Sequence, residues 1–299
     1  MEIPLDVIKI ISGFMVKHKM KLLDNRPVDS IYWYSISENI NGIDLLEANM
    51  GLIHWDKLSL NPNGIHLLEA NPDKIDWVYL SYNPNGMHLL EANPDKIDWA
   101  SLSFNPNGIS LLESNPDKIN WKNLSSNPNG IALLEANQDK IHWKNLSYNP
   151  NGISLLESNQ DKIDWDYLSY NPNGIHLLKA NPDKINWAFL CINPNGIPLL
   201  EENANLDKIG ILGWNYLCQN PNAIHILEAN LDKICEIIYR NPNGIKLLYS
   251  DKMAPIIKTY SKNYIIVYFS ENPNIFEPDT KQINLNLSNK TIIIDSMLN

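Results

Sequence analysis

Apolar and polar residues follow one another along the chain in a pattern that returns every 22 residues. Residues 61–82 read NPNGIHLLEANPDKIDWVYLSY, with two apolar groups separated by a polar stretch. Between the nine tryptophans, seven intervals are 22 residues long and the last is 27. A fixed period of this length is typical of a solenoid, because a single unit cannot bury its apolar face without its neighbours.

Two short helices are predicted in each repeat. The first covers residues 61–70, with Asn61 as the N-cap and Pro62 at the first helical position. The second covers residues 77–82, because the residue before the tryptophan is often Asp or Asn, both good N-caps. A second helix that begins at Pro72 is the alternative. Helices this short are unstable alone, so we expect stacking to stabilise them.

The apolar side of each helix indicates how the repeats stack. Ile65 and Leu68 lie three residues apart on the first helix, and Trp77 and Leu80 do so on the second. Both helices therefore turn one side toward a shared core. Glycine is unfavourable inside a helix, so the recurrence of Gly64 predicts close backbone approach by the neighbouring repeat.

Asparagine recurs at three positions of the repeat, represented by Asn61, Asn63 and Asn71. Its side chain commonly caps helices and closes turns. We expect these residues to cap helices and to link neighbouring repeats in side-chain ladders. A polar recognition surface is the alternative use of the same residues.

The repeats cover residues 33–277 and predict an all-α, elongated α-helical solenoid of about eleven two-helix units, counting the degenerate ends. Spaced apolar residues predict an amphipathic helical cap within residues 1–32. Residues 278–299 match no repeat and are interpreted as a C-terminal tail or cap. Five extra residues in the segment that follows Glu201 predict a loop.

Composition argues against several classes of partner. The net charge is −10 and the chain has no basic run, so we do not expect nucleic acid binding. Lysines interrupt the apolar residues of the first segment, which therefore fits neither a signal peptide nor a membrane span. Three cysteines, an odd number, favour a reducing compartment such as the cytoplasm.

Candidate chemistry is weak, and we expect neither an enzyme nor a cofactor. One position of the repeat often carries histidine, but successive repeats lie about 9–10 Å apart, whereas zinc binds nitrogen at about 2.0–2.1 Å. We therefore expect no metal site. The carboxylates of Glu69, Asp73 and Asp76 recur without a unique partner, so they do not indicate a catalytic pair.

Three positions of the repeat vary while the rest stay nearly constant, and this variation predicts a binding site for a protein partner. Large aromatic residues, which often anchor interfaces, occur at the second position after the tryptophan, and a variable position of the first helix carries histidine. The candidate residues are Tyr79, Tyr167, His176, Phe189 and Tyr216. The aromatic residues cluster toward the carboxyl end, at Tyr167, Phe189 and Tyr216, so we expect the partner site at roughly residues 165–220. Drift at tolerant positions is the alternative interpretation.

The repeat motif NPNGI-x-LLEANPDKI-x-W-x-x-LS, at residues 61–81, resembles repeats in uncharacterised proteins of giant, mimivirus-like viruses. The resemblance covers about residues 30–280. It implies a viral protein with a repeat fold and no known catalytic residues. The stretch IPLDVI, at residues 3–8, also resembles the opening of an F-box.

These observations predict a non-enzymatic scaffold for protein–protein interaction, acting on a host partner in the host cell cytoplasm. A structural component of the virion or viral factory is one alternative. A substrate adaptor whose residues 1–32 dock a ubiquitin-ligase subunit is another.

Overall fold

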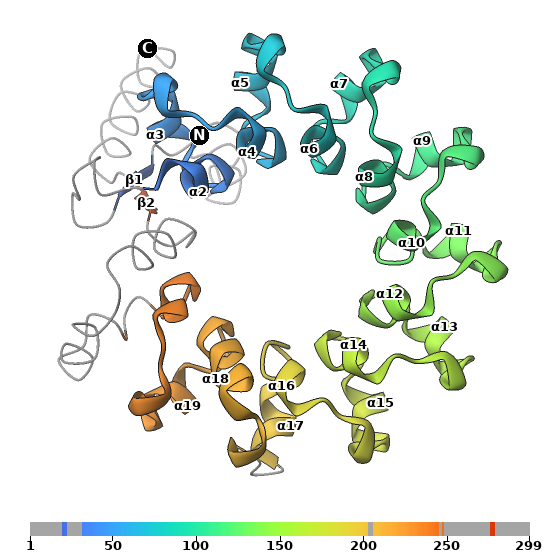
Figure 1. The fold of residues 1–299 in the computed structure, drawn as a ribbon, viewed down its shortest axis with the longest axis vertical. Coiled ribbons are helices and arrows are strands. Elements are labelled where there is room, and N and C mark those ends of the chain that lie inside the picture. Colours follow the sequence, from blue (N-terminus) through green and yellow to red (C-terminus); the bar gives the residue numbers. More distant parts are fainter. Residues whose placement is uncertain (1–19, 23–31, 203–205, 245–246, 248–275, 279–299) are drawn as a thin grey trace, which may run out of the picture.

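The computed structural model describes residues 20–22, 32–202, 206–244, 247 and 276–278. Over this part of the chain the protein is an α-helical solenoid, in which short helices stack in two rows around a central opening (Figure 1). This confirms the predicted fold class. Of the predicted helical cap at residues 1–32, the structure describes residues 20–22, which form a short strand, and residue 32; the rest of the cap and residues 279–299 of the predicted tail lie outside the described residues.

The inner row contains the helices that begin at or near the recurring tryptophans (Figure 1). These helices are α2 (Trp33–Glu38), α4 (Trp55–Leu60), α6 (Trp77–Tyr82), α8 (Trp99–Phe104), α10 (Trp121–Leu124), α12 (Trp143–Tyr148), α14 (Trp165–Tyr170), α16 (Trp187–Leu190) and α18 (Gly210–Gln219). The predicted second helix, residues 77–82, has the bounds of α6.

The outer row contains the helices that carry the leucine pair of each repeat (Figure 1). These helices are α3 (Ile43–Glu47), α5 (Ile65–Ala70), α7 (Met87–Ala92), α9 (Ile109–Ser114), α11 (Ile131–Glu135), α13 (Ile153–Glu157), α15 (Ile175–Ala180), α17 (Ile197–Glu202) and α19 (Ile224–Ala229).

A single 3-10 turn follows each outer helix and leads back to the inner row. These turns are Met50–Leu52, Pro72–Lys74, Pro94–Lys96, Pro116–Lys118, Gln138–Lys140, Gln160–Lys162, Pro182–Lys184, Leu206–Lys208 and Leu231–Lys233. A longer 3-10 helix, Glu236–Arg240, takes the place of the last inner helix. The alternative of an α-helix from Pro72 is therefore wrong, because only a short turn forms there.

The predicted start of the first helix is also wrong. Asn61 does not cap α5, which begins at Ile65 with Gly64 at the N-cap. Instead, Asn61 Oδ1 accepts a hydrogen bond from the Asn63 backbone N–H at 3.0 Å and closes a turn. A Cβ at Gly64 would lie 2.6 Å from Leu58 Cδ1 in the preceding helix, so a larger residue there would require this leucine side chain to shift. The close approach predicted for this glycine is thus made by a leucine side chain of the preceding unit.

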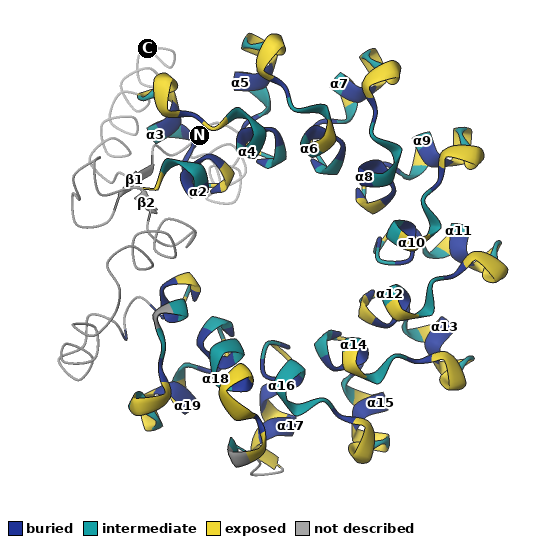
Figure 2. Cartoon of the chain, viewed as in Figure 1, coloured by how far each residue is buried: buried dark blue, intermediate teal, exposed yellow. Residues whose placement is uncertain are grey.

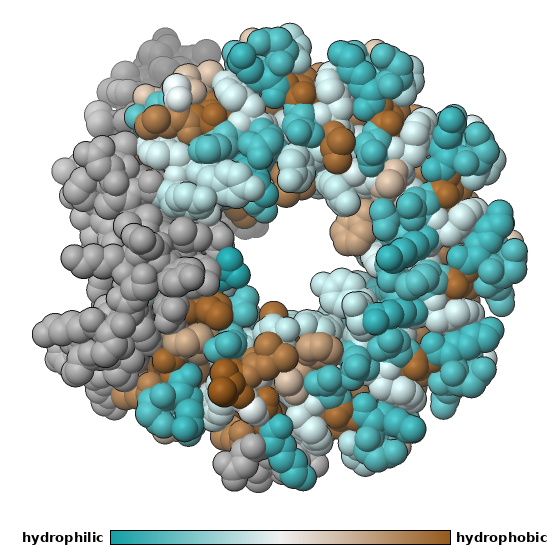
Figure 3. Space-filling model, viewed as in Figure 1, coloured by the Kyte–Doolittle hydropathy of each residue, from teal (hydrophilic) through white to brown (hydrophobic). Residues whose placement is uncertain are grey.

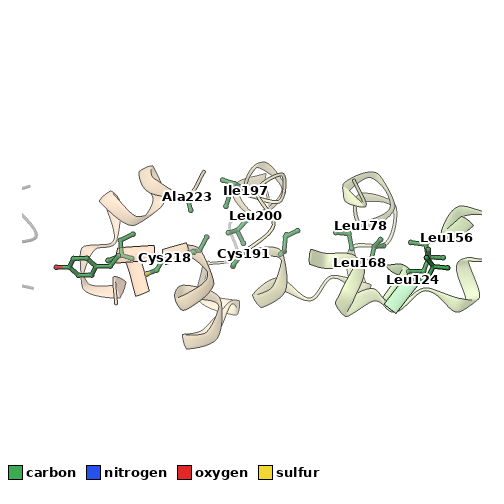
Figure 4. Packing of buried hydrophobic residues seen from close by; sticks show 14 of the residues in the cluster. Leu124, Leu156, Leu168, Leu178, Cys191, Ile197, Leu200, Cys218 and Ala223 are labelled. Atoms are coloured by element: carbon green, nitrogen blue, oxygen red, sulfur yellow. The ribbon is translucent and has the colours of Figure 1, made fainter. Parts of the chain in front are cut away.

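The core lies between the two rows (Figure 2). One leucine from each row, such as Leu168 of α14 and Leu178 of α15, is fully buried (Figure 4). The tryptophans are only half-buried and pack against this leucine core from its edge. The leucines therefore supply the centre of the apolar core, and the tryptophans extend it.

Two ladders of polar side chains join neighbouring repeats through the core. Asn83 is fully buried, and its Nδ2 donates to the carbonyls of Ser59 at 2.9 Å and Asn61 at 3.0 Å. The Asp98 backbone N–H donates to Ser81 Oγ at 3.1 Å, so buried serines form the second ladder. The predicted asparagine ladder is confirmed, and the serine ladder adds a second link.

The array curves around the central opening instead of running straight (Figure 1). Consecutive inner helices pack directly on one another, while consecutive outer helices make far fewer contacts. Strand β1 (Met20–Leu22) pairs antiparallel with β2 (Phe276–Pro278), with Met20 opposite Pro278. This pairing joins a segment before the first repeat to a segment after the last described helix (Figure 1).

Candidate functional site

An aromatic cluster lies on the inner row, where four consecutive inner helices meet. Tyr170 is its centre, with ring centroids 6.1 Å from Tyr148, 4.6 Å from Phe189 and 6.1 Å from Tyr216. These residues come from α12, α14, α16 and α18. The inner row borders the central opening of the molecule (Figure 3). We call these four residues, together with Tyr167, the aromatic cluster.

The cluster encloses a shallow hollow of about 220 Å³ lined by Tyr148, Tyr167, Tyr170 and Phe189. Tyr148 is 46% exposed, while the other three rings are half-buried. Sites for drug-sized ligands or cofactors usually occupy about 300–1,000 Å³. The hollow is therefore better suited to one side chain of a partner than to a whole cofactor.

Capping residues set the direction of the helices that carry the cluster. Asp164 Oδ1 accepts from the Tyr167 backbone N–H at 3.1 Å, and Asn186 Oδ1 accepts from that of Phe189 at 3.1 Å. Each cap fixes the first turn of its helix. Tyr167 of α14 and Phe189 of α16 are thereby held toward the hollow.

The hydroxyl of Tyr170 lies inside the cluster and donates to the hydroxyl of Tyr216 at 3.1 Å. Burial raises the pKa of Tyr170 above its usual value, and the hydrogen bond to Tyr216 raises it further. The phenol is therefore neutral at physiological pH. The cluster offers ring faces and hydroxyl groups to a ligand.

Charged residues flank one side of the cluster. Lys144 Nζ lies 4.6 Å from the ring centroid of Tyr167 and 3.9 Å from Asp164 Oδ2. Asp166 is exposed, and its Oδ1 accepts a hydrogen bond from Asn186 Nδ2 at 2.8 Å. Within the described residues, the Asp166 carboxylate forms no ion pair with a lysine, arginine or histidine.

A second aromatic group lies on the first inner helices and already holds a cation. Lys57 Nζ lies 4.8 Å from the ring centroid of Tyr34 and 5.2 Å from that of Tyr79, and 3.4 Å from Glu38 Oε2. Burial lowers the pKa of Lys57, but hydrogen bonds and attraction from Tyr34 and Glu38 outweigh it and raise the pKa. The lysine is charged and fills the space between the two tyrosines.

The structure brings together three of the five residues predicted from the sequence. Tyr167, Phe189 and Tyr216 belong to the aromatic cluster. Tyr79 lies far along the inner row, beside Lys57. His176 lies on the outer helix α15, where its Nε2 is 2.8 Å from Glu157 Oε1 of the preceding repeat. Neither Tyr79 nor His176 is part of the cluster.

Sequence reasoning missed Tyr148 and Tyr170, the central members of the cluster. Both occupy the fifth position after a tryptophan, and this position also varies along the array. Its occupants are Glu38, Leu60, Tyr82, Phe104, Ser126, Tyr148, Tyr170, Ile192 and Gln219. The same search for variable positions would therefore have found them.

The recurring histidines pair with glutamates of the preceding repeat on the outer row. Four such pairs have Nε2–Oε1 distances between 2.7 and 2.8 Å: His66–Glu47, His88–Glu69, His176–Glu157 and His225–Glu201. In the part of the chain that the structure describes, no group of three or more His, Cys, Asp or Glu residues could hold a metal ion. The pairs serve as links between repeats.

The cysteine thiols lie at the inner-helix position that is serine in most repeats. Burial raises the pKa of the Cys191 thiol to about 12, and Cys191 Sγ donates to the Trp187 carbonyl at 3.1 Å. The pKa of Cys218 is also raised, first by its hydrogen bond with Cys235 and then by burial. Thiols held protonated in this way are poor nucleophiles.

None of the described helices combines the length and the apolar character needed to cross a lipid bilayer.

Comparison with known proteins gives one match. No curated protein and no solved structure matches the chain. The family model described as periplasmic copper-binding protein (NosD) matches residues 24–190, a stretch that runs from before α2 to the end of α16. Because this match covers more than half of the 299 residues, the chain belongs to the family described as periplasmic copper-binding protein (NosD).

Proposed function

We propose that the protein is a non-enzymatic scaffold that binds a protein partner on its inner face. The observation that carries the proposal is the aromatic cluster around Tyr170. Tyrosine and phenylalanine are enriched at the centres of protein interfaces, because they bury a large area at a low cost in side-chain entropy. The half-buried rings are also held in place by their neighbours, so little order has to be gained on binding.

The rest of the repeat supports a framework role. The buried asparagines and serines join one repeat to the next, and their positions stay nearly constant along the array. Variation is concentrated at positions on the inner helices, such as Val78, Ala100 and Lys122. Repeat proteins commonly use this division between a constant framework and variable concave positions for partner binding.

Copper binding, which the family description names, does not fit the donor groups of the described residues. The matched residues 24–190 include no cysteine, and the three histidines of the outer row within them each face a single glutamate. A copper site built from nitrogen and oxygen ligands needs several donors around one ion. We therefore derive no step of the function through copper.

We further propose a host protein as the partner and the host cytoplasm as the place of action. The resemblance of the repeat motif to repeats of giant-virus proteins supports a host partner. The chain has three cysteines, an odd number, which favours a reducing compartment over the periplasm of the family description. The net charge of −10 disfavours nucleic acid as a partner.

Two other functions receive less support. Assembly into a virion through the ends of the solenoid is disfavoured, because β1 and β2 join both end segments within one chain. The ligase-adaptor function depends on residues 3–8, which lie outside the described residues.

Site-specific photo-cross-linking tests the proposed function. We would replace Tyr148 on the inner helix α12 with a benzophenone amino acid, and, as the control, the exposed Ser154 on the outer helix α13. After irradiation in an extract of the host cell, we expect a discrete cross-linked protein from position 148 that excess unlabelled protein competes away. Cross-linking of a competed partner from position 154 and not from position 148 would show that the inner face is not the binding site.

A further inference from the structure

Lysines of this chain already occupy aromatic faces along the inner row. Lys57 lies between Tyr34 and Tyr79 with Glu38 beside it, and Lys144 lies over Tyr167 with Asp164 beside it. In both places a cation meets tyrosine rings and one carboxylate. A cation over an aromatic face is stabilised by the negative potential of the ring. The inner row therefore contains two sites in which a lysine lies over tyrosine rings beside a carboxylate.

The same arrangement recurs one repeat after Lys144 and Tyr167, without its cation. Phe189 occupies the repeat position of Tyr167, but the residue at the position of Lys144 is here Asp166. Within the described residues no lysine or arginine lies over the rings of Phe189, Tyr170 or Tyr216. Rings and a carboxylate are thus present at this end of the aromatic cluster, and the cation is missing.

Asp166 is placed to complete such a site. Its Oδ1 accepts from Asn186 Nδ2 at 2.8 Å, and Asn186 Oδ1 in turn accepts from the Phe189 backbone N–H at 3.1 Å. The carboxylate is therefore tied to the start of the helix that carries Phe189. Asp166 is exposed, and a carboxylate has further acceptor positions for a ligand's N–H groups.

We propose that the aromatic cluster binds an arginine side chain from a basic segment of the partner protein, with the guanidinium stacked on Phe189 and Tyr170 and paired with Asp166. The proposal rests on the proposed function and deepens it. Arginine suits the site better than lysine, because its planar group stacks on rings and donates two parallel hydrogen bonds to a carboxylate. The hollow of about 220 Å³ has room for one such side chain. A net charge of −10 attracts a basic segment to the protein.

Titration with short peptides tests this proposal on the full-length protein. The probes are an amidated Gly-Arg-Arg-Gly peptide and the same peptide with citrulline, which keeps the shape and removes the charge. By NMR or calorimetry at low salt, we expect the arginine peptide to bind roughly tenfold more tightly than the citrulline peptide. Binding should weaken as salt is added, because the site is accessible to solvent.

Two variants with matched controls locate the binding. Asp166→Asn and Phe189→Leu should each weaken binding of the arginine peptide about five- to tenfold. Asp56→Asn changes an acid at the same repeat position, and Phe104→Leu removes an exposed ring from α8, so neither should affect binding. Because Asp166 is exposed, its variant should fold normally even if Phe189→Leu perturbs α16.

Several results would overturn the proposal. Equal binding of the two peptides, no binding of either, or equal losses in the control variants would each rule out an arginine site at this cluster. Preferential binding of a proline-rich peptide would point instead to apolar recognition by the rings. Cross-linking at position 148 does not depend on the peptide titration. If a partner cross-links there but the arginine peptide does not bind, the inner face binds a partner without an arginine site. If no partner cross-links at position 148, the proposed function itself is wrong.

Discussion

Asn127 offers a direct test of how the repeats are held together, and we expect Asn127→Ala to lower the free energy of unfolding by about 3–5 kcal/mol. Its side chain is fully buried. Nδ2 donates to the Ser103 carbonyl at 3.1 Å and to the Asn105 carbonyl at 2.8 Å, and Oδ1 accepts from the Asn129 N–H at 2.9 Å. Each bond contributes about 1 kcal/mol, and a buried group left unpaired costs about 1–3 kcal/mol.

Urea unfolding followed by circular dichroism measures this loss. The control is Asn129→Ala, which removes one exposed hydrogen bond, from Nδ2 to the Pro106 carbonyl at 2.9 Å. We expect that variant to lose about 1 kcal/mol or less. Because Asn127 lies in the middle of the array, its loss should also reduce the cooperativity of unfolding between the two halves. A loss of less than about 1 kcal/mol for Asn127→Ala would refute the role of the asparagine ladder.

Three further variants test packing. Gly130→Ala should lower the free energy of unfolding in urea by about 1–3 kcal/mol, because its Cβ would lie 2.8 Å from Leu124 Cδ1. Gly51→Ala is the control and should be neutral or slightly stabilising, because the space around its Cβ is open. Equal losses of stability in the two variants would refute this steric argument. Trp121→Ala should cost about 2–3 kcal/mol, since the ring is half-buried, and a cost below about 1 kcal/mol would place it outside the core. Iodoacetamide at pH 8.5 should modify Cys191 more than about tenfold more slowly in the folded protein than in urea, because its pKa of about 12 keeps the thiol protonated; equal rates by mass spectrometry would contradict its burial.

The helices were predictable to different degrees, for reasons that lie in particular side chains. The start of α6 follows from Asp76, whose Oδ1 accepts from the backbone N–H groups of Val78 and Tyr79. The start of α5 was misplaced because the Asn61 side-chain oxygen accepts a backbone N–H hydrogen bond in a turn and not at the start of a helix. Its Oδ1 closes a turn, and its Nδ2 reaches the carbonyls of the preceding repeat, a contact that no local pattern reveals.

The curvature of the array could not be predicted from the period. The curvature depends on a small rotation between successive repeats, and the spacing of the tryptophans gives no information about this rotation. The structure shows its origin in the close packing of inner helices such as α12 on α14. The pairing of β1 with β2 was missed for a similar reason, because two three-residue segments more than 250 residues apart carry no sequence signal for pairing.

The candidate site was predicted in part. Tyr167, Phe189 and Tyr216 were found because one repeat position carries aromatic residues there. The central Tyr170 was missed because the fifth position after the tryptophan was not counted among the variable positions. Its contact with Phe189, the third residue of the next inner helix, is visible only in the structure. His176 was misplaced in the site because the sequence alone does not show that its helix lies on the outer row.

Hydrogen–deuterium exchange of the protein, free and bound to the partner captured by cross-linking, tests the central claim most directly. The claim is that the inner face around the aromatic cluster binds this partner. We predict slower exchange in α12, α14, α16 and α18 on binding, and unchanged exchange in the outer helices α13 and α15. Protection confined to the outer helices or to the 3-10 turns would contradict the claim.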